Sequence, residues 1–512
     1  MKEISTIDRS QMQILSLDVM VPSDSIVRVL DVFLDFAEST ELGFKKEKQK
    51  TGRPSFPTRT LLGIYLYGYL HKIRSSRDLE KSCKVNVEVM WLVKGQHPCY
   101  KTISNFRKIN KKGFRNLFIF YRDFCKELDL YGKDVVAIDG SKFRAQNSMK
   151  NNYNEKKIIR HLDYIETKVE EYIESLDEED KMDAKENPDN HLKLQEFAER
   201  KLQYEALQKQ LNESEATQLS TTDPDAKSLP LKMNIVEVSY NLQSAVDAKY
   251  NLIVDYQITN KSDFSALAPM SLSAKEALDL KSTDSITVLA DKGYYSGEQI
   301  AKCHDHNIDT LVAPKSKTSK SKDPKVSKAK FIYEKTTDKY TCPKGINLHR
   351  QGKVYKRHDG IPFKRYVAHW TDCSKCPWVD ICVSTGSQKA SRGRMLNRSI
   401  YEDQMDENDK QVNLRKEEYR KRQAIVEHPF GTIKRQWGFN HTLMKTIPKV
   451  ETEFSIIMLC YNLRRTMSIL GLDGLKKALK VAFYHFFALP SLIDHQSTKK
   501  EIQFHHAPLS LS

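Results

Sequence analysis

Two short, wholly apolar runs, each followed by an aspartate, constrain the fold of this chain more than any other feature. Val135–Ile138 is followed by Asp139, and Ile286–Ala290 is followed by Asp291. Short runs of this kind, rich in Val, Ile and Leu, are typical of strands that helices cover on both faces of a sheet. The chain therefore predicts an α/β fold, with each acid placed where a buried strand emerges.

Further strand and helix patterns lie around these two runs. Residues 234–248 and 251–260 alternate like the two strands of a hairpin. Residues 265–280 and 296–307 have helical spacing, and residues 309–314 read as a short strand. The alternation of strands and helices favours a mixed sheet flanked by helices.

The 512 residues are too many for one ordinary core, so several structural units are expected. Residues 1–130 have helical spacing throughout and predict an all-helical N-terminal domain. An α/β domain is predicted over 131–470, with a highly charged helical insertion at 152–215 and a cysteine-bearing insert at 330–395. A C-terminal helix and tail are expected over 471–512.

The charge balance favours an anionic partner. Lys and Arg number 83 against 67 Asp and Glu, a net charge of +16, which suits DNA, RNA or an anionic membrane surface. No run approaches the roughly 18 to 20 apolar residues of a membrane span, and the N-terminus has no secretory signal pattern. A soluble protein of the cytoplasm is therefore expected.

The N-terminal helices offer a candidate DNA-binding module. The short helices after Arg74 and after Lys101 resemble helix-turn-helix units. The alternative is a helical bundle whose Lys and Arg side chains are merely solvated. The pattern alone leaves both interpretations open.

Three carboxylates are candidates for chemistry. Asp139 and Asp291 at the ends of adjacent strands could hold a divalent cation, because Asp oxygens suit Mg²⁺ and Mn²⁺; alternatively both are ordinary turn residues. Glu427 lies in a predicted helix, with Arg420 seven residues before it and Lys434 seven residues after it on the same face. A solvated amphipathic helix would look the same.

Four cysteines crowd one region and predict a structural zinc site. One cysteine is followed after thirty residues by a C-x₂-C-x₅-C pattern, and the set is Cys342, Cys373, Cys376 and Cys382. Unligated thiols are the alternative, and a redox pair is a weaker one. Spare ligand candidates, each more ordinarily structural, are His349, His358 and His369.

Several segments together resemble bacterial insertion-sequence transposases of the DDE class. The strongest are VVAIDGSKFRA, SYNLQSAVDA, VLADKGYYSG and VEHPFGTIKR, and GRPSFPTRTLLGIYLYGYLHKIRSSRDLEKS resembles the N-terminal module of that family. The likeness runs from about residue 10 to residue 470. It implies a catalytic core of the ribonuclease H type whose triad is Asp139, Asp291 and Glu427, holding two Mg²⁺ or Mn²⁺ ions for in-line phosphodiester substitution.

The likeness departs from the family pattern at one point. In the family signature, a Tyr is followed after two residues by an Arg, then after three residues by a Glu, and then after six residues by a Lys. Glu427 and Lys434 have this spacing, whereas Tyr419 and Arg422 lie one residue too far upstream of Glu427. Helical phase favours Arg420 as the DNA contact, and family order favours Arg422. Other candidate phosphate contacts are Lys142, Lys292 and Lys434.

The resemblance leaves three activities to compare. The leading one is a transposase that frees the 3′ ends of its own element and joins them to target DNA, as a dimer that pairs two ends, associated with the bacterial nucleoid. A ribonuclease H-like nuclease without strand transfer is the second. A catalytically inactive relative that only binds DNA is the third.

Overall fold

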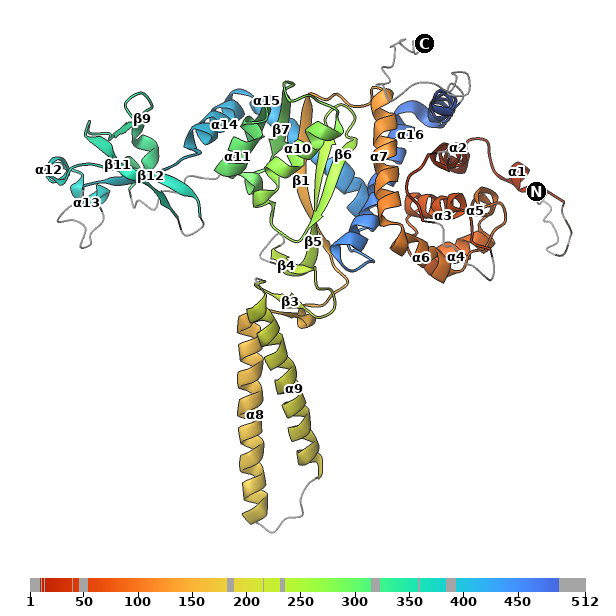
Figure 1. Cartoon of the computed structure of the whole chain (residues 1–512), viewed down its shortest axis with the longest axis horizontal. Helices are drawn as coiled ribbons and strands as arrows, with labels where there is room; N and C mark the ends of the chain where they lie inside the picture. The colour runs from red at the N-terminus through yellow and green to blue at the C-terminus, as the bar shows by residue number, and fades with distance from the viewer. Residues whose placement is uncertain are drawn as a thin grey trace, which may run out of the picture. The chain divides into compact units, whose positions relative to one another are not determined.

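The computed structural model describes residues 10, 12, 14–38, 40–45, 54–181, 188–214, 216–230, 235–314, 323–357, 360–383 and 393–487. The chain divides into two compact units, Met1–Phe124 with Ser455–Ser512, and Cys125–Phe454. Helices and sheets are mixed along it, so the predicted α/β class is confirmed (Figure 1).

Helices alone make up the described part of the first unit. They are α1 (Leu17–Met20), α2 (Ile26–Glu38), α3 (Thr58–Leu70), α4 (Ser76–Val85), α5 (Val87–Leu92), α6 (Tyr100–Ile109) and α7 (Lys111–Glu127), which ends just inside the second unit. Nearly every residue of α3 is buried, so this helix forms the centre of the unit. The buried Tyr65 and Tyr69 on α3 bind Ile103 and Arg107 of α6 through their hydroxyls, at 2.6 and 2.8 Å.

A six-stranded mixed sheet forms the core of the second unit. Its strands are β1 (Val135–Arg144), β4 (Lys227–Pro230), β5 (Val236–Asp247), β6 (Ile253–Thr259), β7 (Ile286–Ala290) and β8 (Ile308–Val312). The order is β4-β5-β1-β7-β8, with β6 also paired to β5. β7 and β8 run parallel to β1, whereas β5 runs antiparallel to it. The predicted hairpin is β5 with β6.

Helices and short turns connect and cover these strands. α10 (Leu267–Ala277) contacts β1, β5, β6 and β7, and α11 (Gly297–His304) contacts β8. α14 (Glu402–Leu414) packs on β8, and α15 (Lys416–Phe430) packs on β1, β5 and β7. Two 3₁₀ turns, η3 (Asp263–Ser265) and η4 (Lys292–Tyr294), contact each other, and a π-helical turn, η7 (Gly431–Gln436), follows α15.

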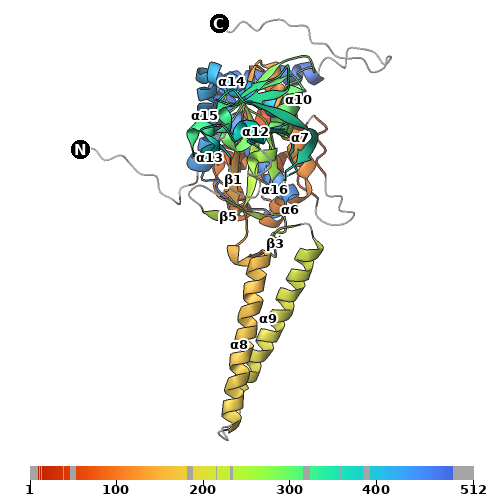
Figure 2. The same cartoon turned by 90° about the vertical axis from the view of Figure 1, so that its left-hand side faces the viewer.

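The charged insertion forms the predicted helical hairpin. α8 (Glu155–Lys181) and α9 (Pro188–Glu213) lie side by side in both views (Figure 1, Figure 2). A short pair of strands, β2 (Asn152–Tyr153) with β3 (Leu219–Ser220), joins the two ends of the hairpin. The rings of His161 and Tyr204 stack between the two helices, with their centroids 4.8 Å apart. Ile158, Ile165 and Leu211 are buried here, whereas Ile159, Ile173, Leu192 and Leu202 are exposed, so only some of the spaced apolar residues pack between the helices.

The cysteine-bearing segment folds into a five-stranded antiparallel sheet that the sequence did not predict. Its strands are β9 (Ile332–Glu334), β10 (Lys339–Thr341), β11 (Asn347–Lys356), β12 (Pro362–Val367) and β13 (Met395–Ser399), in the order β13-β12-β11-β10-β9. The short helices α12 (Trp370–Cys373) and α13 (Val379–Cys382) carry three of the cysteines or adjoin them.

The last described helix, α16 (Ile447–Phe487), bends at Gly471, whose φ of 72° ordinary side chains rarely adopt. Its residues from 455 onward belong to the first unit. Across the described ranges, no helix combines the length and apolar character that a bilayer crossing requires.

Candidate active site

Asp139 lies inside strand β1, not at its end as predicted. β1 continues to Arg144 because the long antiparallel strand β5 pairs with it throughout, and Asp139 stands opposite Ser244. On its other side, β1 pairs with β7 only from Val135 to Ala137. The edge of β1 next to Asp139 is therefore not paired with β7.

The carboxyl of Asp139 is in an unusual electrostatic environment. Its pKa is raised to about 6: burial is the largest cause, the guanidinium of Arg422 opposes it, and the negative charges of Asp291 and Asp263 add to the rise. These effects act over short range inside a protein. The three acids and Arg422 therefore lie close enough to act on one another.

Asp291 directly follows β7 and caps the turn η4. Its carboxylate accepts a hydrogen bond from the backbone N–H of Gly293 at 2.7 Å. A Cβ at Gly293 would stand 2.8 Å from the same carboxylate oxygen, so only glycine allows this close approach. The sequence Asp-Lys-Gly thus forms a tight turn that fixes the carboxylate beside the sheet.

Glu427 does not join these two acids. It lies on α15, which packs on β1, but its side chain is exposed and accepts a hydrogen bond from Gln423 at 2.8 Å. Among the residues that the structure describes, no group of three or more His, Cys, Asp or Glu side chains is placed to hold a metal ion. The predicted convergence of three carboxylates is therefore not seen in this conformation.

The two candidate arginines of α15 differ clearly. Arg422 hydrogen-bonds Tyr419 and acts on the pKa of Asp139, whereas Arg420 is exposed and pairs with Glu417. The order of residues in the family signature favoured Arg422 and agrees with this placement. The helical phase favoured Arg420 and does not agree with it. Glu427 is five positions beyond Arg422, so on a regular helix the two project about 140° apart. This extra residue explains why Glu427 faces away.

The candidate phosphate-binding lysines lie in different surroundings. Lys142 forms an ion pair with Asp263 at 2.9 Å. Lys434 donates to the backbone carbonyl of Lys142 at 2.5 Å and stands 4.3 Å from the centre of the Phe143 ring. Lys292 is exposed. Lys142 and Lys434 thus have protein partners that the sequence did not predict.

Asp263 is a fourth acid that the sequence analysis missed. Burial raises its pKa, but hydrogen bonds from Asn241, Lys142 and Gln243 together hold the pKa below its usual value. It follows the strand β6 after a few polar residues, much as Asp291 follows β7. That shared pattern was the available signal, but the surrounding loop is polar and an acid there is ordinary.

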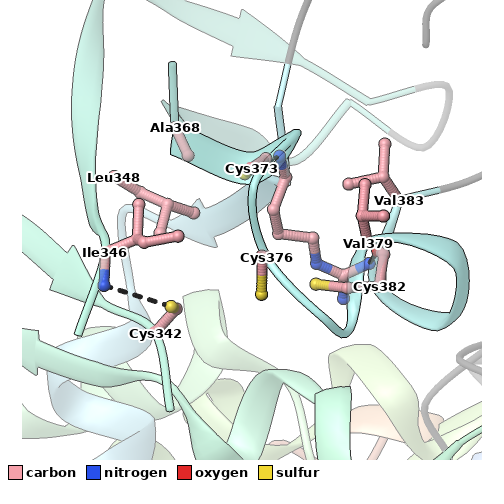
Figure 3. Close-up of a pocket in the computed structure, with 10 residues that line it drawn as sticks. Cys342, Ile346, Leu348, Ala368, Cys373, Cys376, Val379, Cys382 and Val383 are labelled. Atoms are coloured by element: carbon pink, nitrogen blue, oxygen red, sulfur yellow. Dashed lines mark hydrogen bonds between the residues drawn. The ribbon is translucent and has the colours of Figure 1, made fainter. Parts of the chain in front are cut away.

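The four cysteines line one pocket (Figure 3). Cys342 accepts hydrogen bonds from the backbone N–H groups of Lys344 and Ile346 at 3.3 and 3.2 Å. Burial, with the neighbouring thiols, raises the pKa of Cys373 and of Cys382. The predicted grouping is therefore observed, although the thiols are not close enough to share a metal ion in the described part of the chain.

The spare histidine candidates are not part of this pocket. The rings of His349 and His369 are tilted against each other with their centroids 5.9 Å apart, and neither residue is in the described lining of the pocket. His358 lies outside the described residues.

Comparison with known proteins gives two family matches. Residues 15–109 match a transposase domain, DUF772, and residues 236–463 match a transposase DDE domain. No curated protein matches the chain. Among solved structures, a piggyBac transposase in a synaptic complex with hairpin DNA is 10% identical, at a TM-score of 0.31, over 91% of this chain and 80% of that one. So distant a likeness carries no argument.

The two family matches together span well over half of the chain and include the segments around Asp291 and Glu427. They confirm the resemblance inferred from the motifs. The chain belongs to the DDE transposases of insertion sequences, enzymes that cleave DNA and transfer the cut strand.

Proposed function

We propose that this transposase cuts the ends of its own insertion sequence and joins them to target DNA with Asp139, Asp291 and Glu427 as catalytic carboxylates. The environment of Asp139 carries the proposal, because burial and neighbouring negative charges raise its pKa to about 6. Carboxylates that disfavour each other's ionised form become stable together when a divalent cation lies between them.

The donor set at this place fits such a cation. DDE transposases generally use divalent metal ions, and Mg²⁺ and Mn²⁺ prefer carboxylate oxygens. Asp139 and Asp291 would hold the ions, and Glu427 would complete the set. Bound there, two ions would supply an activated water or 3′ hydroxyl and a stabilised leaving oxygen. Arg422 is the proposed contact for a phosphate oxygen.

Glu427 must change orientation to take this role. Its carboxylate is exposed and accepts a hydrogen bond from the exposed Gln423, so turning it away from this position uncovers little buried surface. Helix α15 already packs on β1 and β7, the strands that carry the other two acids. We propose that the third carboxylate joins when metal and DNA are bound.

We assign the core of the second unit to the ribonuclease H class. The support is its mixed sheet, in which β5 is antiparallel and β7 and β8 are parallel to a central β1, with helices packed on it. The proposed domains remain the helical 1–130, the catalytic 131–470 with its two inserts, and the tail 471–512.

We propose that the helical N-terminal domain binds DNA through α4 and α6. Glu80 on α4 accepts the backbone N–H of Tyr100 at 2.9 Å, and Arg77 stacks on the Tyr100 ring at 4.9 Å, so the two helices are held as one unit. Lys101 and Lys108 are exposed two turns apart on α6. Such a helix suits contact with a DNA groove and its phosphates.

Phosphate contacts near the acids are proposed for Arg422 and the exposed Lys292. Arg420 is exposed and Glu417 is its partner, so it could contact DNA only at the periphery. Lys142 and Lys434 have partners within the protein, and any phosphate contact by them would be shared with those partners.

We propose that the four cysteines hold a structural zinc ion. Backbone N–H groups donate to the Cys342 sulfur, and burial, together with the neighbouring thiols, raises the pKa of Cys373 and of Cys382, so a further positive charge is needed to hold these two as thiolates. Zinc would supply that charge and tie α12 and α13 to the sheet. A dimer acting on the bacterial nucleoid is the proposed assembly and location.

One experiment separates the three activities. Purified protein is incubated with Mg²⁺ and a labelled end of the element. Cleavage with joining supports the transposase, cleavage alone the nuclease, and a shifted band without chemistry the inactive relative. Asp139→Ala or Asp291→Ala should abolish both reactions while DNA binding persists. Undiminished joining by either variant refutes the assignment of the acids.

A further inference from the structure

The partly buried carboxylate of Asp263 is at the centre of a hydrogen-bonded network that no motif predicts. One oxygen accepts the side-chain amides of Gln243 at 2.7 Å and Asn241 at 2.8 Å, and the other accepts Lys142 at 2.9 Å. Three strong donors satisfy most of the acceptor capacity of a carboxylate. Asp263 is thus held in place and is not free to serve as a metal ligand.

The network reaches the loop that carries Asp291. The carbonyl oxygen of the Gln243 side chain accepts the hydroxyl of Tyr294, which is fully buried at the end of η4. Tyr294 is three residues after Asp291, and its backbone N–H donates to the Asp291 carbonyl at 3.1 Å. The ring of Tyr294 therefore anchors the Asp291 turn through Gln243.

The same network reaches β1 next to Asp139. A Cβ at Gly140 would stand 2.5 Å from the amide nitrogen of Gln243 and closer still to Asp263. The residue after Asp139 must therefore be glycine if this network is to fit against the strand. Lys142 extends the contact, because its side chain binds Asp263 and its carbonyl accepts Lys434 from η7.

These contacts join the elements that carry the proposed catalytic acids. β1 carries Asp139, η4 follows Asp291, and η7 follows the helix of Glu427. Side chains that hold metal ligands in position without binding the metal commonly change the metal affinity by about 10-fold to 100-fold when they are altered. A purely structural role would change stability without that effect.

We propose that Asp263 is a positioning residue that acts through Gln243 and Tyr294 to hold the Asp291 turn at a fixed place beside Asp139, so that both acids can hold one divalent cation. The inference rests on the proposed function, in that it takes Asp139 and Asp291 as the metal ligands. Asp263 itself contacts neither metal nor DNA.

The test compares two adjacent tyrosines. Tyr294→Phe removes the hydroxyl that binds Gln243, and the control Tyr295→Phe removes a buried hydroxyl that binds Asp409 at 2.8 Å, outside the network. Asp263→Asn is the second variant, because it keeps the shape and removes the charge. Two quantities are measured for each full-length protein. The first is the Mn²⁺ concentration that gives half of the metal-induced rise in Tm, and the second is the Mn²⁺ concentration that gives half of the maximal cleavage rate.

We expect Tyr294→Phe and Asp263→Asn to need at least about tenfold more Mn²⁺ in both assays, and Tyr295→Phe to stay within about twofold of the parent. Metal-free Tm values show whether each variant folds. Equal Mn²⁺ requirements for the folded variants and the control would overturn the inference. If the parent shows neither a Tm rise nor cleavage with Mn²⁺, the proposed function itself fails. That result differs from the one that overturns only this inference, in which the parent is active and the variants have the Mn²⁺ requirement of the parent.

Discussion

Replacing Asp139 by asparagine should stabilise the metal-free protein at neutral pH while abolishing catalysis. The fold disfavours the ionised carboxylate, raising the pKa of Asp139 from 3.8 to about 6. The folded state then binds a proton more tightly than the unfolded state between these two values, so stability falls as pH rises through that window. Two pKa units correspond to roughly 3 kcal/mol, which solvent screening reduces to about 2 kcal/mol.

Urea unfolding of metal-free protein at pH 4 and at pH 7.5 measures this difference. Asp139→Asn should equal the parent near pH 4 and exceed its free energy of unfolding by about 2 kcal/mol at pH 7.5. Asp134→Asn, at the exposed position before β1, controls for the loss of one negative charge. Added Mn²⁺ should stabilise the parent but not Asp139→Asn. A stability difference between variant and parent that does not grow from pH 4 to pH 7.5 would refute the reasoning.

Three further predictions concern other parts of the site. Gly140→Ala should lower the free energy of unfolding by about 3 kcal/mol, because the added Cβ meets the polar atoms of Asp263 and Gln243. Gly352 has open space around it, so the control Gly352→Ala should change the free energy of unfolding by less than about 1 kcal/mol. Urea unfolding measures both changes. Arg422→Gln removes a charge that lowers the pKa of Asp139, so the acid limb of the pH–cleavage profile should move to higher pH, and Arg420→Gln should leave it unchanged. Cys376→Ser should lower the Tm by several degrees. Mass spectrometry should find roughly one zinc ion per chain in the parent and less in the variant. Equal zinc content in both proteins would contradict the proposed zinc site.

The sequence predicted the elements whose hydrophobic pattern reflects burial. β7 is wholly buried, and its run of apolar residues indicated it. β5 and β6 were predicted from their alternation and short turn, although the polar residues of β5, such as Asn241 and Gln243, are buried as well. The acid that follows β7 was identified for the same reason, because it ends a buried run. Patterns set by burial are local in sequence, and for that reason they can be read without a structure.

The contacts around Asp263 could not be predicted in this way. Its partners Asn241, Gln243 and Lys142 lie 22, 20 and 121 positions away, and no pattern records which of them a polar loop will meet. The five-stranded sheet of the cysteine insert was missed for a related reason. Its strand β11 is mostly exposed and polar, so it lacks the alternation that would indicate a strand.

The placement of Glu427 depends on departures from a regular helix. Spacing predicted that Glu427 and Lys434 share one face, but Lys434 contacts β1 while Glu427 is exposed. Pro429 lies between them and has no N–H to donate, and the π-helical turn η7 begins two residues later. A wider turn changes the angle between residues seven apart, just as the extra residue before Glu427 separates it from Arg422. Both neighbours therefore face the site while Glu427 does not. Whether the third acid joins the other two depends on this one segment of α15, which explains why spacing identified the residue and not its orientation.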